Sequence, residues 1–97
     1  MSQQTQDTLR KRIVGNFLRK SREKAELTQW SVAHALEYTT AQFVSNWERG
    51  VSLPPLDTLP KLATLYRVTP AQFVSVMTRY DEEMLKLQKK ALREVFK

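Results

Sequence analysis

The chain has 97 residues, enough for one domain, and its 41% hydrophobic and 27% charged residues are typical of a folded globular protein. It has no cysteine and only one histidine, which excludes disulfides, thiolate chemistry and cysteine-based zinc sites. The net charge of +6 favours an anionic partner, such as nucleic acid or a membrane surface.

No stretch is apolar enough for a signal peptide or for the ~18 residues that a membrane span needs, so we expect a cytoplasmic protein with no membrane span. The sequence has no glycine-rich phosphate loop, and its one carboxylate run, at 81–83, is typical of a solvated helix face. We therefore expect no enzymatic activity, with no catalytic residue, no metal and no cofactor.

Only two glycines and four prolines interrupt the chain, and apolar residues recur at helical spacing, so the predicted fold class is all-α. The first helix is predicted at about 8–24, behind a flexible N-terminal arm at 1–7. Thr28 is expected to cap a short second helix that starts at the next residue.

The third helix is expected to begin at Thr39 or Thr40, and the choice between them decides where Gln42 points. With Thr39 as the cap, Gln42 lies at the third helical position and folds back in a capping box. With Thr40 as the cap, Gln42 points outward. Thr40 is favoured because it keeps Val44 and Trp47 on the core side of the helix.

Glycine and proline predict the remaining helix ends. Gly50 is expected to end the third helix, because glycine takes up a left-handed conformation at little cost. A loop at 51–55 leads into a fourth helix at about 56–66. Thr69, followed by proline and then by glutamine at the third position, forms a capping-box pattern, and nothing after it interrupts a helix up to residue 97.

The two sides of the third helix differ in character. At 100° per residue, one side carries Phe43, Val44 and Trp47, and the other carries Gln42, Ser45, Asn46 and Arg49. Amide, hydroxyl and guanidinium groups can bind base edges in the major groove of DNA. The alternative is an ordinary solvated helix face.

The last helix carries an apolar stripe with alternating spacings of four and three, which is typical of a seam between helices. Its members are Phe73, Met77, Tyr80, Met84, Leu87 and Ala91. The first two turns are expected to pack within the chain. From Met84 onward, through Leu87 and Ala91, the stripe either forms a seam with another chain or frays.

The order of these motifs resembles the phage-repressor and Cro-type helix-turn-helix family, often called Xre. The resemblance spans about 17–76 and depends on the segments LTQWSVAHAL, TTAQFVSNWERG and VSLPPLDTLPKLATLYRVTPAQF. It implies a five-helix lambda-repressor-like DNA-binding domain at 8–80 and a C-terminal helical extension at 81–97. The implied function is a sequence-specific regulator of transcription, such as a repressor, that binds double-stranded DNA.

The resemblance also implies residue roles. Base contacts come from the third helix, about 41–48, through Ala41, Gln42 and Asn46. The DNA backbone is contacted by Thr28, Gln29, Thr40, Phe43, Ser45, Arg49 and Ser52. Ala33, Val44 and Trp47 hold the second helix against the third. Arg22 and Glu48 correspond to a buried ion pair with a structural role.

The turn between the second and third helices departs from the family pattern. Glu37 stands where the family usually has glycine, and glutamate tolerates a left-handed conformation poorly. The turn at 37–39 is also one residue longer than the commonest form. We expect the longer turn to avoid the left-handed conformation.

The partners predicted from these features are double-stranded DNA and a second copy of the chain, with the C-terminal helix as the dimer element. One alternative is an antitoxin, which would cover a toxin with that helix and bind its own promoter. Another is a membrane-surface module, because residues 86–97 are basic and amphipathic. The N-terminal cations are either phosphate contacts or, as we favour for most of them, the solvated side of the first helix: Arg10, Lys11, Arg12, Arg19 and Lys20.

Overall fold

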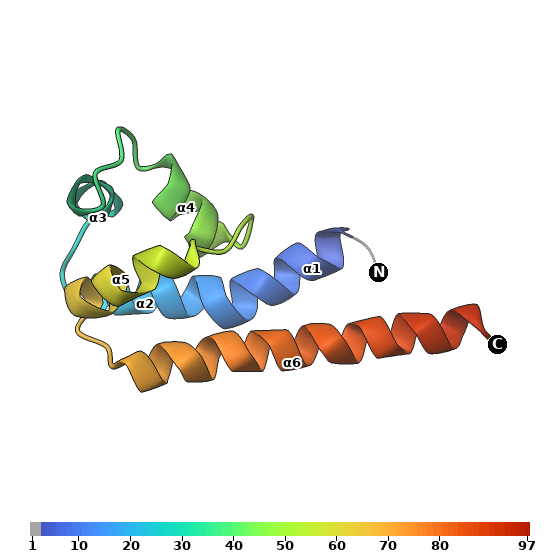
Figure 1. The fold of residues 1–97 in the computed structure, drawn as a ribbon. Helices are drawn as coiled ribbons and strands as arrows, with labels where there is room; N and C mark the ends of the chain where they lie inside the picture. The colour runs from blue at the N-terminus through green and yellow to red at the C-terminus, as the bar shows by residue number, and fades with distance from the viewer. Residues whose placement is uncertain (1–2) are drawn as a thin grey trace.

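The computed structural model describes residues 3–97, which form helices and turns without a strand. The elements are α1 (Gln3–Arg10), η1 (Lys11–Gly15), α2 (Asn16–Lys24), α3 (Gln29–Ala35), α4 (Gln42–Arg49), η2 (Leu56–Thr58), α5 (Leu59–Tyr66) and α6 (Pro70–Val95). The predicted all-α class is confirmed. The described residues form five helices, because α1, η1 and α2 make one continuous helix (Figure 1).

The continuous N-terminal helix begins earlier than predicted. Residues 3–7, expected in a flexible arm, are helical, and residues 1–2 of that arm lie outside the described range. The helix widens to a π-turn at η1, where Gly15 lies against α4. A methyl group at Gly15 would collide with the backbone carbonyl of Glu48, so only glycine lets the two helices come this close.

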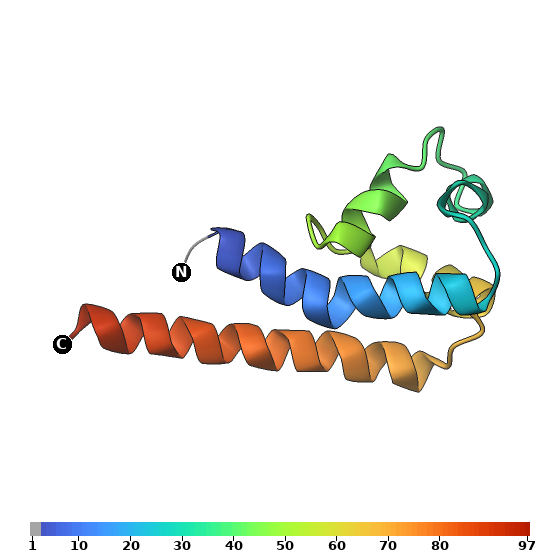
Figure 2. The ribbon, with the colours of Figure 1, turned by 180° about the vertical axis from the view of Figure 1, so that it is seen from behind.

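The N-terminal helix lies between two other parts of the molecule. α3 and α4 lie on one side of it and the long α6 runs along the other, with the start of α1 and the end of α6 at the same end of the molecule (Figures 1 and 2). Side chains from all five helices fill the core between them: Leu9, Ile13, Val14, Leu18, Val32, Ala33, Val44, Trp47, Leu62, Ala63, Tyr66, Phe73 and Tyr80. None of the described helices is long and apolar enough to cross a membrane.

The predicted apolar stripe of α6 packs on the chain's own N-terminal helix over more turns than expected. Phe73 meets Phe17 edge-on, with ring centroids 5.4 Å apart, and Tyr80 is buried. Met84 and Leu87 are half-buried and pack against the same core. A seam with another chain on Met84, Leu87 and Ala91 stays a prediction, but Met84 and Leu87 pack within their own chain in this structure. The reason is that α1 extends back to Gln3 and covers them.

Four helices end with one residue in the left-handed conformation, at Glu26, Glu37, Gly50 and Arg67, with φ between 57° and 79°. At each end the next residue's N–H donates back to a carbonyl five positions earlier, at 2.9–3.1 Å. This pattern is the Schellman motif. The expectation that the longer turn spares Glu37 is wrong, because Tyr38 needs that conformation to reach the carbonyl of Ala33.

Candidate nucleic-acid interface

The inner side of α4 is anchored in the core. Val44 and Trp47 are almost fully buried, as are Val32 and Ala33 on α3, so the two helices are held rigidly together. Apolar burial of this kind contributes roughly 1.5–3 kcal/mol for each large side chain. The orientation of α4, and hence of everything on its outer side, is fixed by this packing.

The start of α4 settles where Gln42 points. The helix begins at Gln42, and the Thr40 hydroxyl accepts the backbone N–H of Gln42 at 3.2 Å. The N-cap is Ala41, so the prediction that Thr40 caps the helix is wrong by one residue: Thr40 precedes the cap, and its hydroxyl binds the first helical N–H. Gln42, as the first helical residue, does not fold back in a capping box. Its side chain is exposed and runs along the outer face of the helix.

Four side chains on that outer face form one hydrogen-bonded row, which we call the polar strip: Gln42, Ser45, Asn46 and Arg49. The Asn46 Oδ1 accepts from Gln42 Nε2 at 2.8 Å and from Arg49 Nη2 at 2.6 Å. Arg49 Nε donates to the Ser45 hydroxyl at 3.2 Å. The strip is held by its own hydrogen bonds, with Gln42 and Arg49 exposed and Ser45 and Asn46 half-buried.

Aromatic rings brace the turn beside the strip. Tyr38 lies between Phe43 and Trp47, with ring centroids 5.1 Å and 6.0 Å away. Phe43 is still 54% exposed and so stays accessible for the thymine-methyl or backbone contact predicted for it. Ala41, predicted to contact bases, is half-buried against the core.

The Arg22–Glu48 ion pair joins α2 to α4. The guanidinium donates from Nε to Oε2 at 2.6 Å and from Nη2 to Oε1 at 3.0 Å, and its third contact is the carbonyl of Leu27 at 2.8 Å. The side chains are 14% and 4% exposed. The hydrogen bonds that Arg22 donates to Glu48 raise the pKa of Arg22, so the guanidinium keeps its charge.

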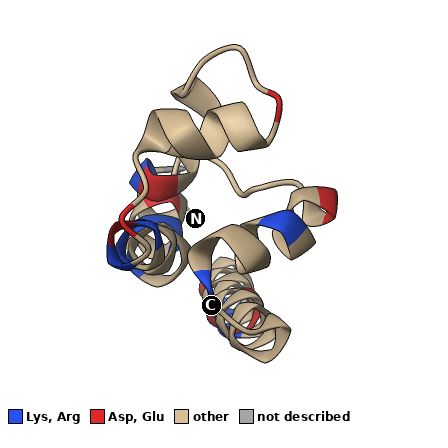
Figure 3. Ribbon diagram, turned by 90° about the vertical axis from the view of Figure 1, so that its left-hand side faces the viewer, with Lys and Arg blue, Asp and Glu red and all other residues tan. Residues whose placement is uncertain are grey.

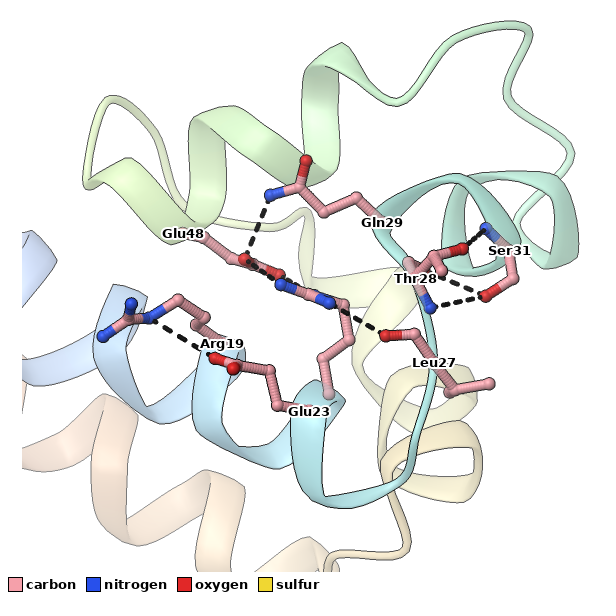
Figure 4. Close-up of polar contacts among 8 residues, drawn as sticks. Arg19, Glu23, Leu27, Thr28, Gln29, Ser31 and Glu48 are labelled. Atoms are coloured by element: carbon pink, nitrogen blue, oxygen red, sulfur yellow. Dashed lines mark hydrogen bonds and ion pairs between the residues drawn. The ribbon is translucent and has the colours of Figure 1, made fainter.

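At the N-terminal end of α3, the structure adds a contact within the chain for one of the two predicted DNA-backbone residues. Thr28 caps the helix in a capping box with Ser31, and it is exposed as a phosphate contact requires. Gln29 was predicted to contact the DNA backbone. Its Nε2 donates to Glu48 Oε1 at 3.1 Å (Figure 4), because that carboxylate oxygen has capacity for a second donor. The Gln29 side chain thus serves the ion pair.

Arg10 holds the loop after α4, a role that the sequence did not indicate. Its Nη1 donates to the carbonyls of Gly50 and Val51 at 2.7 Å and 3.1 Å, and its Nε donates to the Tyr80 hydroxyl at 3.2 Å. The sequence favoured a solvated face for most of the N-terminal cations, but the Arg10 side chain lies in contact with this loop and is only 13% exposed. These contacts span 40 and 70 positions, so no local pattern could reveal them. The same loop positions Ser52, which is half-exposed.

A helix, a turn and a second helix with an exposed polar side thus lie between residues 29 and 49. The family model described as "Helix-turn-helix domain" matches residues 13–74. The chain belongs to the helix-turn-helix domain family. A search of curated proteins and a search of solved structures gave no significant match. In the helix-turn-helix motif, α3 is the first helix and α4 is the second, the helix that enters the major groove in DNA-binding members.

Charge is unevenly distributed around this helix-turn-helix. Between residues 25 and 60, Arg49 is the only Lys or Arg. Figure 3 shows α3 free of charged residues and Lys and Arg on the N-terminal helix beside it. The motif itself therefore contributes one cation, and any further phosphate contacts must come from neighbouring segments.

Proposed function

We propose that the protein is a sequence-specific regulator of transcription that binds double-stranded DNA as a homodimer, in the manner of the phage-repressor and Cro-type proteins. The carrying observation is the polar strip on α4, with Gln42 and Arg49 exposed and its side chains linked by hydrogen bonds, while Val44 and Trp47 on the opposite side of the helix are buried. An amide in this position binds adenine N6 and N7 bidentately.

Roles within the strip follow from its chemistry. Gln42 and Asn46 carry the amides, so they distinguish bases, and Ala41 lies at the edge where the helix starts. Arg49, with Thr28, Thr40, Phe43, Ser45 and Ser52, contacts the backbone of the duplex. The internal hydrogen bonds of the strip are exchanged for bonds to bases and phosphates on binding. In a dimer, the two α4 helices would enter major grooves about 34 Å apart.

The test is selection of bound duplexes from random DNA at a stated salt concentration, followed by variants on the selected site. Gln42→Ala should lose about 1–3 kcal/mol on the selected site and relax base preference there. Gln4→Ala, on an exposed residue of α1, is the matched control. Equal losses on selected and random DNA would remove Gln42 from the base contacts.

Arg49 gives a different signature. Arg49→Ala should weaken binding to all sequences alike and reduce the slope of affinity against salt by about one unit. Lys61→Ala removes an exposed cation from α5 and is the control. A loss confined to the selected sequence would make Arg49 a base contact and not a phosphate contact.

The alternative function, an antitoxin, is favoured by one feature. Leu85, Leu92, Val95 and Phe96 at the end of α6 are at least half exposed and would suit a protein partner. Co-expression with the product of the neighbouring gene, followed by purification of a stable complex, would support this function over a free homodimer.

A further inference from the structure

α6 carries a second row of residues beside the stripe that packs on α1, and this row faces away from the core. We call it the outer stripe: Val74, Thr78, Asp81, Leu85, Gln88, Leu92 and Val95. Its spacings alternate between four and three, as in a coiled-coil seam. Every member is exposed, and its four apolar side chains are 50–76% exposed.

The first part of the outer stripe borders an apolar groove between α5 and α6. The groove has a volume of about 680 Å³ and is lined by Leu59, Ala63, Val74, Met77 and Thr78, with Asp81 at one end. The short α5 lies beside only the first part of α6, so the rest of α6 extends past it (Figure 2). The outer stripe therefore runs from a groove into open solvent.

The molecule exposes more surface than a compact monomer of its size. A folded 11.3 kDa chain exposes about 5,700 Å², whereas this one exposes 6598 Å². The excess of about 900 Å² is close to the ~800 Å² that one partner contributes to a standard protein interface. The radius of gyration, 14.8 Å against about 12.5 Å for a compact domain of this length, agrees with an extended α6.

Charge along α6 decides the orientation of a partner. The middle of the helix has the acidic run 81–83, and the last part has Lys86, Lys89, Lys90, Arg93 and Lys97 with one glutamate. Two copies in parallel would place acid against acid and base against base. Two antiparallel copies place the basic end of each near the acidic run of the other, where Asp81 and Glu82 have no ion-pair partner within residues 3–97.

We propose that a second copy of this chain docks antiparallel along the outer stripe of α6, with its last helical turns seated in the groove between α5 and α6. The contact is reciprocal, as a two-fold interface requires, so both grooves are filled and both basic ends meet acidic runs. This inference rests on the proposed function, which requires a dimer, and it names the face that makes it.

The first test is the mass of the full-length protein in sedimentation equilibrium without DNA. Wild type should be a dimer, and the double variant Leu85→Glu, Leu92→Glu should be a monomer with unchanged helix content by circular dichroism. Val51→Glu, on an exposed apolar residue outside α6, is the control and should stay dimeric. A monomeric wild type at the highest soluble concentration, or a dimeric double variant, overturns the proposal.

Orientation is tested by cross-linking, which the absence of native cysteine makes simple. Val74→Cys and Leu92→Cys lie about 27 Å apart along one helix. A mixture of the two variants should cross-link with a short bis-maleimide, whereas each alone should not. Cross-linking of each variant with itself indicates a parallel pair and overturns the proposal.

These experiments distinguish failure of the docking from failure of the proposed DNA-binding function. A wild-type monomer that still selects a duplex refutes the docking and leaves the DNA-binding function intact. A dimer that binds no duplex supports the docking and refutes the DNA-binding function. A wild-type monomer that instead forms a stable complex with a different protein through Leu85 and Leu92 assigns the outer stripe to that partner and also overturns the docking of a second copy.

Discussion

Breaking the Arg22–Glu48 pair from one side should destabilise the fold strongly. In Arg22→Met, the Glu48 carboxylate stays 4% exposed and loses two charged hydrogen bonds, at 2.6 Å and 3.0 Å. Only the amide of Gln29 remains as a donor among its described contacts. An uncompensated buried charge of this kind lowers the free energy of unfolding by about 3–5 kcal/mol.

The chain supplies its own comparison. Arg19 and Glu23 form a pair at 3.8 Å with side chains 52% and 58% exposed (Figure 4). Because solvent screens that pair, Arg19→Met should change the free energy of unfolding by less than about 1 kcal/mol. Both variants remove one arginine from an ion pair. The difference between their losses in free energy of unfolding therefore measures the effect of burying the pair.

The double variant Arg22→Met, Glu48→Leu gives the second comparison. It removes both charges together, so it should recover most of the loss seen in Arg22→Met. Urea unfolding followed by circular dichroism, analysed at a common m-value, gives all four free energies. The reasoning fails if Arg22→Met is no more destabilising than Arg19→Met, or if the double variant is no more stable than Arg22→Met.

The remaining predictions concern backbone conformation and pH. Glu37→Gly should raise the free energy of unfolding by about 0.5–1 kcal/mol, since glycine relieves φ = 65° but loses more chain entropy, and unchanged or lower stability in urea refutes this. Gly50→Ala should lower it by more than about 1–2 kcal/mol, because a methyl group there also meets the backbone of Asp7 and Lys11; a loss under 1 kcal/mol refutes the close packing. Burial is the main cause, and the nearby Glu48 the second, of a pKa of Tyr66 well above 10 in the folded protein. Because the unfolded chain releases the Tyr66 proton first, the contribution of the neutral Tyr66 side chain to stability is complete below pH 10 and is lost at higher pH. Wild type should therefore lose stability relative to Tyr66→Phe above pH 10, and parallel profiles would contradict this.

Sequence reasoning succeeded where the determinants are local. Thr28 and Thr69 cap helices through residues three positions away, and Gly50 ends α4 in the left-handed conformation, as their patterns predict. The N-cap of α4 was predicted one residue too early, at Thr40 in place of Ala41, but helical periodicity correctly placed Val44 and Trp47 on the core side. Hydrogen bonds and side-chain spacing within one or two turns depend on neighbouring residues alone.

Two expectations about helix ends and packing were not met, for different reasons. Glu37 was expected to avoid positive φ, but the reach of Tyr38 to Ala33 outweighs the strain. The packing of Met84 and Leu87 within the chain was not predicted, because nothing in the sequence showed that α1 reaches back to Gln3. The first is a local hydrogen bond at a helix end that outweighs the preference of one residue, and the second is a contact between segments far apart in the sequence.

The sequence by itself determined that the chain is helical, where most helices start and stop, and which residues make up the two sides of α4, because these depend on short-range periodicity and capping. Only the tertiary structure decided that Arg10 holds the loop after α4, that Gln29 turns inward to Glu48, and that the outer stripe of α6 is the exposed one. Those outcomes depend on residues 19 to 70 positions apart meeting in space, and the energy of such contacts exists only once the helices have packed.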